Sequence, residues 1–249
     1  MLMRRLTWIV LMAAINLTAK AQSEGALVLG VETEKKFTKQ LTIGLEADMR
    51  SRNDFKTMDR WSIGVGADYK LASWLKMDVG YSLLSSNFRE KITYKSSGAY
   101  NKWRPSYWGY RYRFHASLTG FYRFSNNIRL SLRERWQYTW RPEQMVSRWD
   151  FDDAQWKEKL RSGTGKNQLR SRLLVTLDKK KLLLRPYLSV ELYNNWGLEK
   201  VRYTLGTDIK LGKNQMLDVF YRYQNQRQVD DSDYDPDMHY IGICYKLKL

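Results

Sequence analysis

Apolar and polar residues alternate with a period of two along most of the chain. Between residues 200 and 211, apolar or aromatic side chains occupy most of the alternate positions, and charged or small polar side chains lie between them. Successive side chains point to opposite faces of a β-strand, so this pattern predicts a strand with one apolar and one polar face. The pattern predicts eleven strands in all, at residues 26–37, 41–50, 60–71, 75–83, 110–124, 128–140, 169–178, 184–193, 200–211, 217–224 and 240–249.

The connections between these strands also follow a pattern. Short turns alternate with longer polar loops, of which the longest are residues 85–107 and 142–166. Strands of about ten residues, short turns at one end and long loops at the other are typical of an antiparallel transmembrane β-barrel. Within the first long loop, residues 92–94 are expected to extend the preceding strand above the membrane. Because closed single-chain barrels usually have an even number of strands, we expect ten or twelve rather than the eleven counted.

The polar faces decide which side of the predicted barrel is inside. They carry many more charged groups than a dry core accommodates, so we expect a polar lumen and an apolar surface facing lipid. One interpretation is a salt-bridge lattice that fills the lumen, and the other is an open pore that prefers anions; a barrel this narrow favours the lattice. Glu134 breaks the pattern on the apolar face and predicts a β-bulge. The predicted lattice comprises Arg111, Arg113, Arg133, Arg135, Arg170, Arg172, Arg185, Arg202 and Arg222, with the carboxylates of Glu46, Asp48, Glu191, Asp208 and Asp218.

The first 21 residues differ in composition from the rest of the chain. Two arginines precede an apolar run over residues 6–17, and an Ala-Lys-Ala triplet ends at Ala21. A charged start, a short apolar run and such a triplet are typical of a secretory signal peptide. We therefore expect export, cleavage after Ala21, and one barrel domain over residues 22–249.

Composition narrows the function classes. The chain has 43 Lys and Arg against 26 Asp and Glu, and without the predicted signal peptide 40 basic residues remain, for a net charge of +14. Such a balance is compatible with nucleic-acid binding, but the basic residues are expected inside the barrel, so we expect no nucleic-acid partner. The single cysteine, Cys244, excludes an internal disulfide or a cysteine-based metal site, and we expect no cofactor.

Two groups of residues are candidates for chemistry. His115 and Ser117 resemble the His-x-Ser of outer-membrane lipid A deacylases, and such a pair supplies a base and a nucleophile. The strand register points them into the lumen, however, so we expect no enzyme, with a lipid-modifying hydrolase as an alternative. Five aspartates lie between residues 230 and 237, but they lack the Gly and Glu of an EF-hand loop. A solvated acidic loop is the expected interpretation, with a weak external Ca²⁺ site as the other.

The last strand contains an arrangement similar to the assembly signal of outer-membrane proteins. This arrangement is Tyr240-x-Gly242-x-x-Tyr245-x-Leu247, with Leu in the final aromatic position. The resemblance implies that the outer-membrane barrel-assembly machinery recognises the strand. Outer-membrane lipids and lipopolysaccharide are then the expected partners, and a soluble secreted β-barrel binding protein is the alternative class.

The last 80 residues contain a second set of recognisable positions. These are Arg170-x-Arg172, Pro186 followed by Glu191, Arg202-x-x-x-Gly206, Tyr221-Arg222-Tyr223 and the strand that contains Gly242. With these positions, the segment resembles an uncharacterised family of Gram-negative outer-membrane barrels, a domain of unknown function. The resemblance implies a fold and a compartment, the bacterial outer membrane, but no activity.

Overall fold

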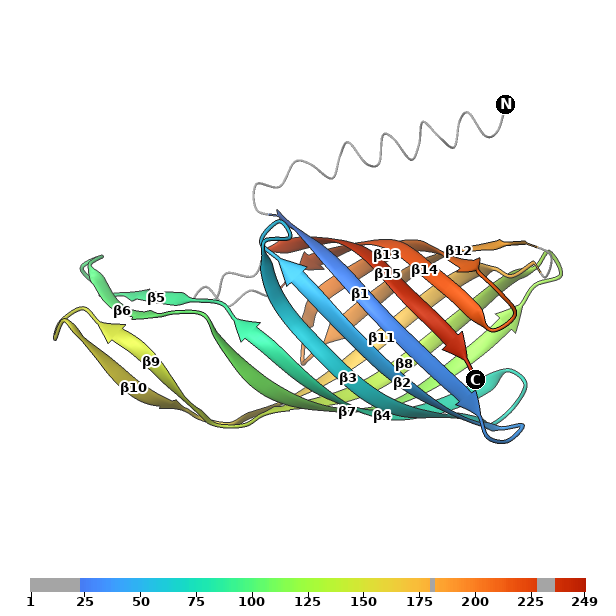
Figure 1. Ribbon diagram of the computed structural model, residues 1–249, viewed down its shortest axis with the longest axis horizontal. Helices are drawn as coiled ribbons and strands as arrows, with labels where there is room; N and C mark the ends of the chain where they lie inside the picture. Colours follow the sequence, from blue (N-terminus) through green and yellow to red (C-terminus); the bar gives the residue numbers. More distant parts are fainter. Residues whose placement is uncertain (1–22, 180–181, 228–235) are drawn as a thin grey trace, which may run out of the picture.

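The computed structural model describes residues 23–179, 182–227 and 236–249, and these residues form an all-β structure. No helix in these three stretches is long and apolar enough to cross a membrane. Fifteen strands are present in the described residues, divided between a closed barrel and a four-stranded sheet. Figure 1 shows the barrel with this sheet extending from one end of it.

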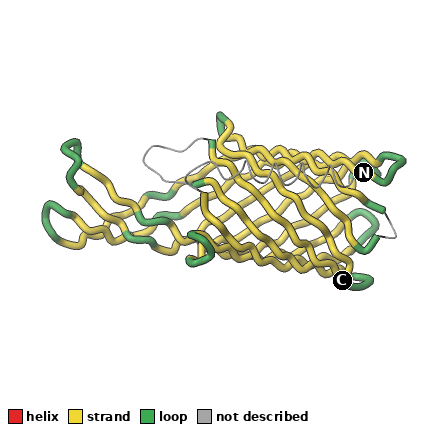
Figure 2. The backbone as a smooth tube through the Cα atoms, turned by 90° about the horizontal axis from the view of Figure 1, so that it is seen from above, coloured by secondary structure: helices red, strands yellow, loops and turns green. Residues whose placement is uncertain are grey.

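Eleven strands close the barrel in the order β1-β15-β14-β13-β12-β11-β8-β7-β4-β3-β2. They are β1 (Ser23–Lys36), β2 (Leu41–Arg52), β3 (Thr57–Lys70), β4 (Leu75–Phe88), β7 (Tyr107–Arg123), β8 (Ile128–Arg141), β11 (Thr164–Leu177), β12 (Leu184–Asn194), β13 (Leu198–Lys210), β14 (Gln215–Gln226) and β15 (Asp237–Lys248). Figure 2 shows how these strands tilt around the barrel.

Two hairpins form the four-stranded sheet, which we call the extension. Its strands are β5 (Lys91–Tyr94), β6 (Tyr100–Arg104), β9 (Gln144–Asp150) and β10 (Gln155–Arg161), in the order β10-β9-β6-β5. The two long segments that the alternation predicts as loops are therefore mainly strands. Residues 92–94 form the short strand β5 rather than a continuation of β4, because β5 pairs with β6 in a separate sheet.

The strand number corrects one expectation. The barrel has eleven strands, not ten or twelve, because β1 and β15 pair in parallel, from Ser23 opposite Asp237 to Glu34 opposite Lys248. An odd number of strands cannot close with antiparallel pairs alone, and this one parallel pair resolves the mismatch. Ser23 consequently lies at the end of the barrel that carries the extension, which we call the loop end. Leu249 lies at the opposite turn end (Figure 1).

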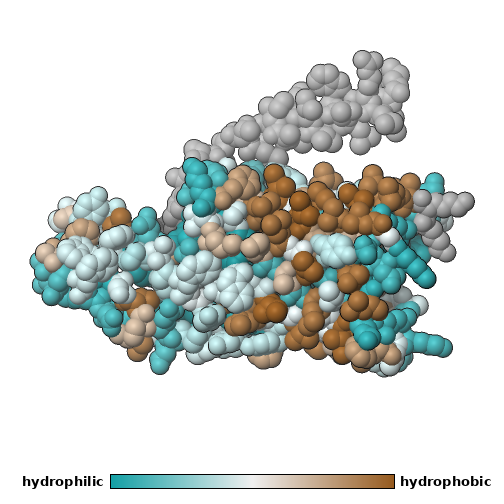
Figure 3. Space-filling view, in the orientation of Figure 1, coloured by the Kyte–Doolittle hydropathy of each residue, from teal (hydrophilic) through white to brown (hydrophobic). Residues whose placement is uncertain are grey.

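The outer surface of the barrel is apolar. Leu45, Ile63 and Leu205 are 57%, 54% and 56% exposed. In a water-soluble barrel, such aliphatic side chains would instead be buried in the core. Figure 3 shows hydrophobic side chains over the barrel and hydrophilic ones on the extension and at the turn end. Aromatic residues ring this band, with Trp61, Tyr110, Phe114, Tyr203 and Tyr221 toward the loop end and Phe37, Tyr69, Trp74, Tyr122 and Phe124 toward the turn end. An apolar band between two aromatic girdles is the surface that a transmembrane barrel presents to lipid.

Glu134 interrupts this band without the bulge that its position predicts. The pairing of β8 with both β7 and β11 runs past Glu134 with no register shift. Its carboxylate lies on the outer face and accepts a hydrogen bond from the Ser171 hydroxyl of β11 at 2.6 Å. The polar residue is tolerated because a neighbouring strand supplies a partner, rather than because the strand bends.

The lumen contains an apolar cluster as well as charged groups. Ala26, Val28, Phe220, Met238 and Tyr240 are buried together on the inner faces of β1, β14 and β15, with Tyr187 packed against them. Gly242 makes this packing possible, because a Cβ atom there would overlap the Phe220 ring. The Gly of the terminal strand therefore provides the space in which an aromatic ring lies flat against the inner wall.

Candidate functional site

The candidate site is the lumen, because the inner positions of the strands carry most of the charged residues of the barrel. The alternation of β7, β8 and β11–β15 puts every arginine of the predicted lattice on an inner position. The five carboxylates lie on inner positions of β2, β12, β13 and β14. These side chains do not form one continuous network but gather around a few carboxylates.

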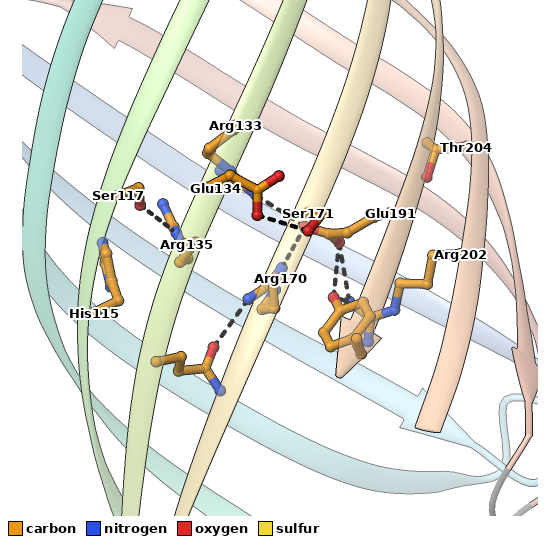
Figure 4. Close-up of polar contacts among 12 residues, drawn as sticks. His115, Ser117, Arg133, Glu134, Arg135, Arg170, Ser171, Glu191, Arg202 and Thr204 are labelled. Atoms are coloured by element: carbon orange, nitrogen blue, oxygen red, sulfur yellow. Dashed lines mark hydrogen bonds and ion pairs between the residues drawn. The ribbon is translucent and has the colours of Figure 1, made fainter. Parts of the chain in front are cut away.

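Glu191 is the most highly connected of these carboxylates. Its Oε1 atom lies 2.9 Å from Arg133 Nη2 and 2.9 Å from Arg170 Nη2, and its Oε2 atom lies 4.0 Å from Arg202 Nη1. The Tyr193 hydroxyl donates to the same Oε2 atom at 2.8 Å. Figure 4 shows these side chains converging from β8, β11, β12 and β13. One buried carboxylate thus contacts arginines from three strands. Removing any one of these charged side chains would leave its partners buried without a countercharge.

Asp78 is a second centre, and it includes the His-x-Ser pair. Asp78 Oδ2 lies 3.1 Å from Arg135 Nη2 and 3.2 Å from His115 Nε2, and it accepts a hydrogen bond from Ser117 Oγ at 2.9 Å. Ser117 in turn accepts from Arg135 Nε at 2.9 Å. His115 and Ser117 therefore each contact the carboxylate, inside the lumen. The Ser117 hydroxyl donates to Asp78, and His115 Nε2 lies near the same carboxylate oxygen, so one carboxylate positions both side chains.

Two further carboxylate centres lie nearer the ends of the barrel. Asp48 contacts Arg50 at 3.1 Å and Arg60 at 3.4 Å, and it accepts a hydrogen bond from Ser62. Lys246 of β15 contacts Asp208 at 2.9 Å and Asp218 at 3.0 Å. Lys246, Arg50 and Arg60 were not among the predicted members of the lattice. Their inner positions in the alternation were the one signal that could have identified them.

Several predicted members make no contact with a lattice carboxylate. Arg113 donates to Thr139 at 3.4 Å, and Arg222 donates to Thr204 at 3.2 Å. Arg185 lies 3.7 Å from Asp178, a residue of the β11–β12 turn. Within the described stretches, the hydrogen bond that Glu46 accepts comes from the Ser82 hydroxyl, at 3.4 Å. Among the described residues, Arg172 has neither an ion pair nor a hydrogen bond, so the lumen contains positive charge in excess of its internal partners.

That excess is concentrated on one wall. The inner faces of β7, β8 and β11 are described over their full length, and they carry no carboxylate. The inner faces of β1 to β4, which include strands across the ring from β8, carry at least seven carboxylates. The arginines of the basic wall are Arg111, Arg113, Arg123, Arg129, Arg133, Arg135, Arg141, Arg170 and Arg172, and the inner-face carboxylates of β1 to β4 include Glu24, Glu32, Glu34, Glu46, Asp48, Asp68 and Asp78.

The two ends of the lumen differ in how far they are filled. Toward the loop end lies the apolar cluster, together with Tyr193, whose ring has Arg170 and Arg202 at 4.6 Å and 4.7 Å. We call the cluster and this stack the loop-end plug. Tyr193, Phe220 and Tyr240 are 3%, 7% and 7% exposed, although they point into the barrel. Side chains therefore fill this half of the lumen, as expected for a narrow barrel.

Toward the turn end lies a cavity of about 1350 Å³, which we call the vestibule. Small inner residues such as Thr42, Gly44, Gly66 and Thr176 line part of its wall. Twelve Lys or Arg residues and seven Asp or Glu residues also line it, including Arg133 and the unpaired Arg172. The vestibule is therefore a space for many water molecules, with a positive balance of charge, bounded by the filled half of the lumen.

The residues of the predicted assembly signal lie in β15, and the aspartate-rich segment leads into that strand. Tyr240 and Gly242 occupy inner positions of β15, whereas Tyr245 and Leu247 occupy outer positions. Most of the aspartate-rich segment, residues 228–235, lies outside the described residues, as does the predicted signal peptide. Asp237 is described and accepts hydrogen bonds from Tyr223 and from Asn225. The described residues contain no group of three or more His, Cys, Asp or Glu side chains arranged to hold a metal ion.

Comparison with protein families gives one match. The model of a family described as "Protein of unknown function (DUF2490)" matches residues 29–235. This range includes ten of the eleven barrel strands in whole or in large part, and all of the extension. A comparison with curated proteins finds no match.

Several solved structures are similar to the barrel. The beta domain of the Bordetella autotransporter BrkA has 12% identity and a TM-score of 0.51, covering 84% of this chain and 82% of that chain. The translocator domain of the autotransporter NalP from Neisseria meningitidis has 10% identity and a TM-score of 0.53, covering 78% and 72%. The NanC porin has 12% identity and a TM-score of 0.44, covering 86% and 92%. At these identities the likeness to the two autotransporter domains shows the fold, an outer-membrane β-barrel.

Proposed function

The chain belongs to the family described as "Protein of unknown function (DUF2490)", and from its lumen we propose a closed, structural outer-membrane barrel. The observation that carries this proposal is the loop-end plug, in which large inward side chains are almost completely buried. A solute of the size of a sugar or an amino acid would have to displace these side chains to pass. The barrel then serves as a rigid, membrane-embedded base for the extension.

A second candidate function is supported by the charge distribution. The inner faces of β7, β8 and β11 carry arginines and no carboxylate, and the vestibule has a positive balance of charge. If the plug moves aside, the barrel becomes a narrow pore that prefers anions. This alternative shares the fold and the compartment with the first and differs only in whether ions pass.

Planar-bilayer recordings of the purified barrel distinguish the two functions. The structural function predicts no stable conductance for the wild type. The variant Tyr193→Ala/Tyr240→Ala removes two plug side chains and is expected to raise the conductance by about tenfold or more, with anion preference. The control Thr42→Ala/Thr176→Ala enlarges the vestibule, which is already open, and should change nothing. A steady wild-type conductance that the plug variant does not alter would overturn the structural function and support the pore.

The proposal includes the location of the protein. The apolar band and its aromatic girdles support insertion in the outer membrane, with lipopolysaccharide and phospholipid around the barrel. We expect cleavage after Ala21, so that the mature chain begins at Gln22, and recognition of the strand containing Gly242 by the barrel-assembly machinery. Fractionation, N-terminal sequencing and a heat-dependent shift in gel mobility test these points. Recovery from the soluble periplasm would instead favour a soluble secreted barrel.

The proposal assigns no catalysis to the lumen. The hydrogen bond from Ser117 to Asp78 supports a structural role for the His-x-Ser pair. Ser117→Ala is therefore expected to leave the lipid A and phospholipid profiles of expressing cells unchanged. A changed lipid profile in cells that produce the wild type, lost in this variant, would revive the lipid-modifying hydrolase.

A further inference from the structure

The extension has two faces of opposite character. On one face, Lys91 lies opposite Arg104, and Lys157 lies opposite Arg148. On the other face, Trp103 lies opposite Trp149. The first face, which we call the basic face, contains one carboxylate, that of Asp150. Its basic residues are Lys91, Lys102, Arg104, Arg148, Lys157, Lys159 and Arg161, and the opposite face carries Ile92, Trp103, Met145, Trp149, Trp156 and Leu160.

A cavity lies against the basic face. Its volume is about 230 Å³, and no acidic residue is among those that line it. Six of its nine lining residues are basic: Lys91, Lys102, Arg104, Arg148, Lys159 and Arg161. The one carboxylate of this face, Asp150, is occupied by Lys157, whose Nζ atom lies 3.1 Å from Asp150 Oδ2.

Three basic residues of the cavity lack an ion pair within the described stretches, although Lys102 lies opposite Asp150 in the sheet. These residues are Lys102, Arg148 and Lys159. Like charges on neighbouring strands repel one another and destabilise a sheet. A sheet that gathers seven basic residues on one face with a single carboxylate is expected to receive further negative charge from a ligand.

The basic face is continuous with the basic wall of the lumen. The rings of Phe88 and Tyr107 are stacked at the barrel mouth with their centroids 5.1 Å apart. Arg161 from the extension lies 4.5 Å from the Phe88 ring, and Arg111 from the lumen lies 4.9 Å from the same ring. Arg104 lies 5.4 Å from the Tyr107 ring. The basic face therefore prolongs the lumen side of β7 and β8, and the aromatic face prolongs the side that contacts lipid.

We propose that the basic face binds a soluble, extended acidic polysaccharide at the loop end of the barrel. The basic residues are spread over four strands, a width of about 14 Å at a strand spacing of about 4.8 Å, which suits a row of anionic groups rather than one ion. Guanidinium and ammonium groups pair with carboxylate and sulfate oxygens by charge-assisted hydrogen bonds. This binding goes beyond the proposed structural function and does not depend on whether the lumen conducts.

Two other polyanions fit the structure less well. Single-stranded nucleic acid requires aromatic side chains interleaved with basic ones, whereas the tryptophans here lie on the opposite face. Lipid phosphates surround the outer side of the barrel, whereas the basic face lies on the lumen side. An acidic polysaccharide needs neither stacking nor a membrane plane.

Binding of dextran sulfate to the barrel in phosphatidylcholine nanodiscs tests the proposal, with uncharged dextran as the matched probe. Wild type should bind dextran sulfate in a salt-dependent way and should not bind dextran. The variant Lys102→Gln/Arg148→Gln/Lys159→Gln should weaken binding about tenfold or more. The control Lys56→Gln/Lys179→Gln/Lys213→Gln removes the same charge from exposed positions outside the extension and should change binding less than about twofold. Lys159→Glu on the edge strand β10 should also weaken binding, and it is the variant to use if the triple variant does not fold.

Three results would overturn the proposal. One is equal binding of dextran sulfate by wild type and by the basic-face variants. The second is tighter binding of an oligothymidylate than of dextran sulfate, with the same loss in the variant, which would indicate single-stranded nucleic acid. The third is capture of phosphatidylglycerol vesicles without binding of dextran sulfate, which would indicate lipid phosphates. None of these results bears on the conductance test of the closed lumen.

Discussion

The loop-end and turn-end halves of the lumen have the same alternation of inner and outer residues, yet one half is filled and the other is open. The difference lies in the size of the inner residues. Tyr193, Phe220 and Tyr240 point inward at the loop end, whereas Thr42, Gly44 and Thr176 line the vestibule. Charge alternation along a strand thus decides which face is inside, but side-chain volume decides whether that inside is open.

The largest expected effect is the loss of Glu191, which lies in the filled half. Glu191→Gln leaves Arg133 and Arg170 without their charged partner at a site where the Glu191 side chain is only 10% exposed. Breaking a buried ion pair in this way costs about 3–5 kcal/mol of unfolding free energy. Urea unfolding in lipid vesicles measures this loss.

The open half provides the control for that variant. Glu34 contacts Lys248 at 2.6 Å, and both side chains are about half exposed. Glu34→Gln should cost less than about 1 kcal/mol, because an exposed pair contributes little. Equal losses in the two variants would mean that the two halves of the lumen are equally hydrated.

A smaller effect is expected from glycine substitutions. Gly242→Ala puts a Cβ atom into the Phe220 ring, whereas at Gly66 the nearest atom to an added Cβ is a carbonyl oxygen at 3.4 Å. We expect Gly242→Ala to destabilise the barrel by about 1–3 kcal/mol through overpacking, and Gly66→Ala to be tolerated. The double variant Gly242→Ala/Phe220→Ala should show coupling between the two positions. Additive losses would place the Phe220 ring elsewhere.

The outer wall allows a test in the opposite direction. Glu134 lies on the lipid-facing surface with Ser171 as its hydrogen-bond partner. Because an acidic side chain in the apolar band is unfavourable, Glu134→Leu should stabilise the barrel in a bilayer by about 1–2 kcal/mol. Urea unfolding of the variant in vesicles measures the change. Destabilisation would indicate that the hydrogen bond with Ser171 outweighs the cost of placing Glu134 in the apolar band.

The smallest expected effect concerns the extension, outside the membrane. The hydrogen bond from Lys157 Nζ to Asp150 holds the pKa of the Asp150 carboxyl below its usual range. The stability that this carboxylate contributes is therefore present above the usual pKa of about 3.9 and is lost as the pH falls through the lowered value. Tryptophan fluorescence should stay constant from neutral pH down to about pH 5 and change below about pH 4. Asp150→Asn should remove that change, and persistence of the change in this variant would assign it to another group.

Much of this architecture could be predicted from alternation alone. The inner positions of the arginines and the outer positions of the aliphatic residues follow from a period of two, which each strand carries locally. Hydrogen bonding between β1 and β15 is not local, since it joins Ser23 to a strand more than 200 residues away, and so the parallel closure was not predicted. The extension was interpreted as loops because its strands alternate basic residues with tryptophans, not polar with aliphatic residues.

The candidate site could be predicted less fully than the fold. The sequence identified which residues line the lumen, but not that Glu191 and Asp78 gather them into separate centres. Those contacts depend on side chains that reach across two or three strands, as Arg133 of β8 reaches Glu191 of β12. The plug was also missed. Phe220 and Tyr240 occupy polar-face positions in the sequence, and the space for the Phe220 ring comes from Gly242 on the neighbouring strand.

Chemical labelling tests the difference between the two halves most directly. In a Cys244→Ser background, Thr176→Cys puts a thiol in the vestibule, and Ser86→Cys puts one in the loop-end half, where Ser86 is 2% exposed. A membrane-impermeant maleimide is then applied to reconstituted barrels from each side of the membrane. A closed loop end predicts rapid labelling of Thr176→Cys from the turn side alone, and slow labelling of Ser86→Cys from both sides. Rapid labelling of both thiols from both sides would show an open channel and contradict the closed lumen.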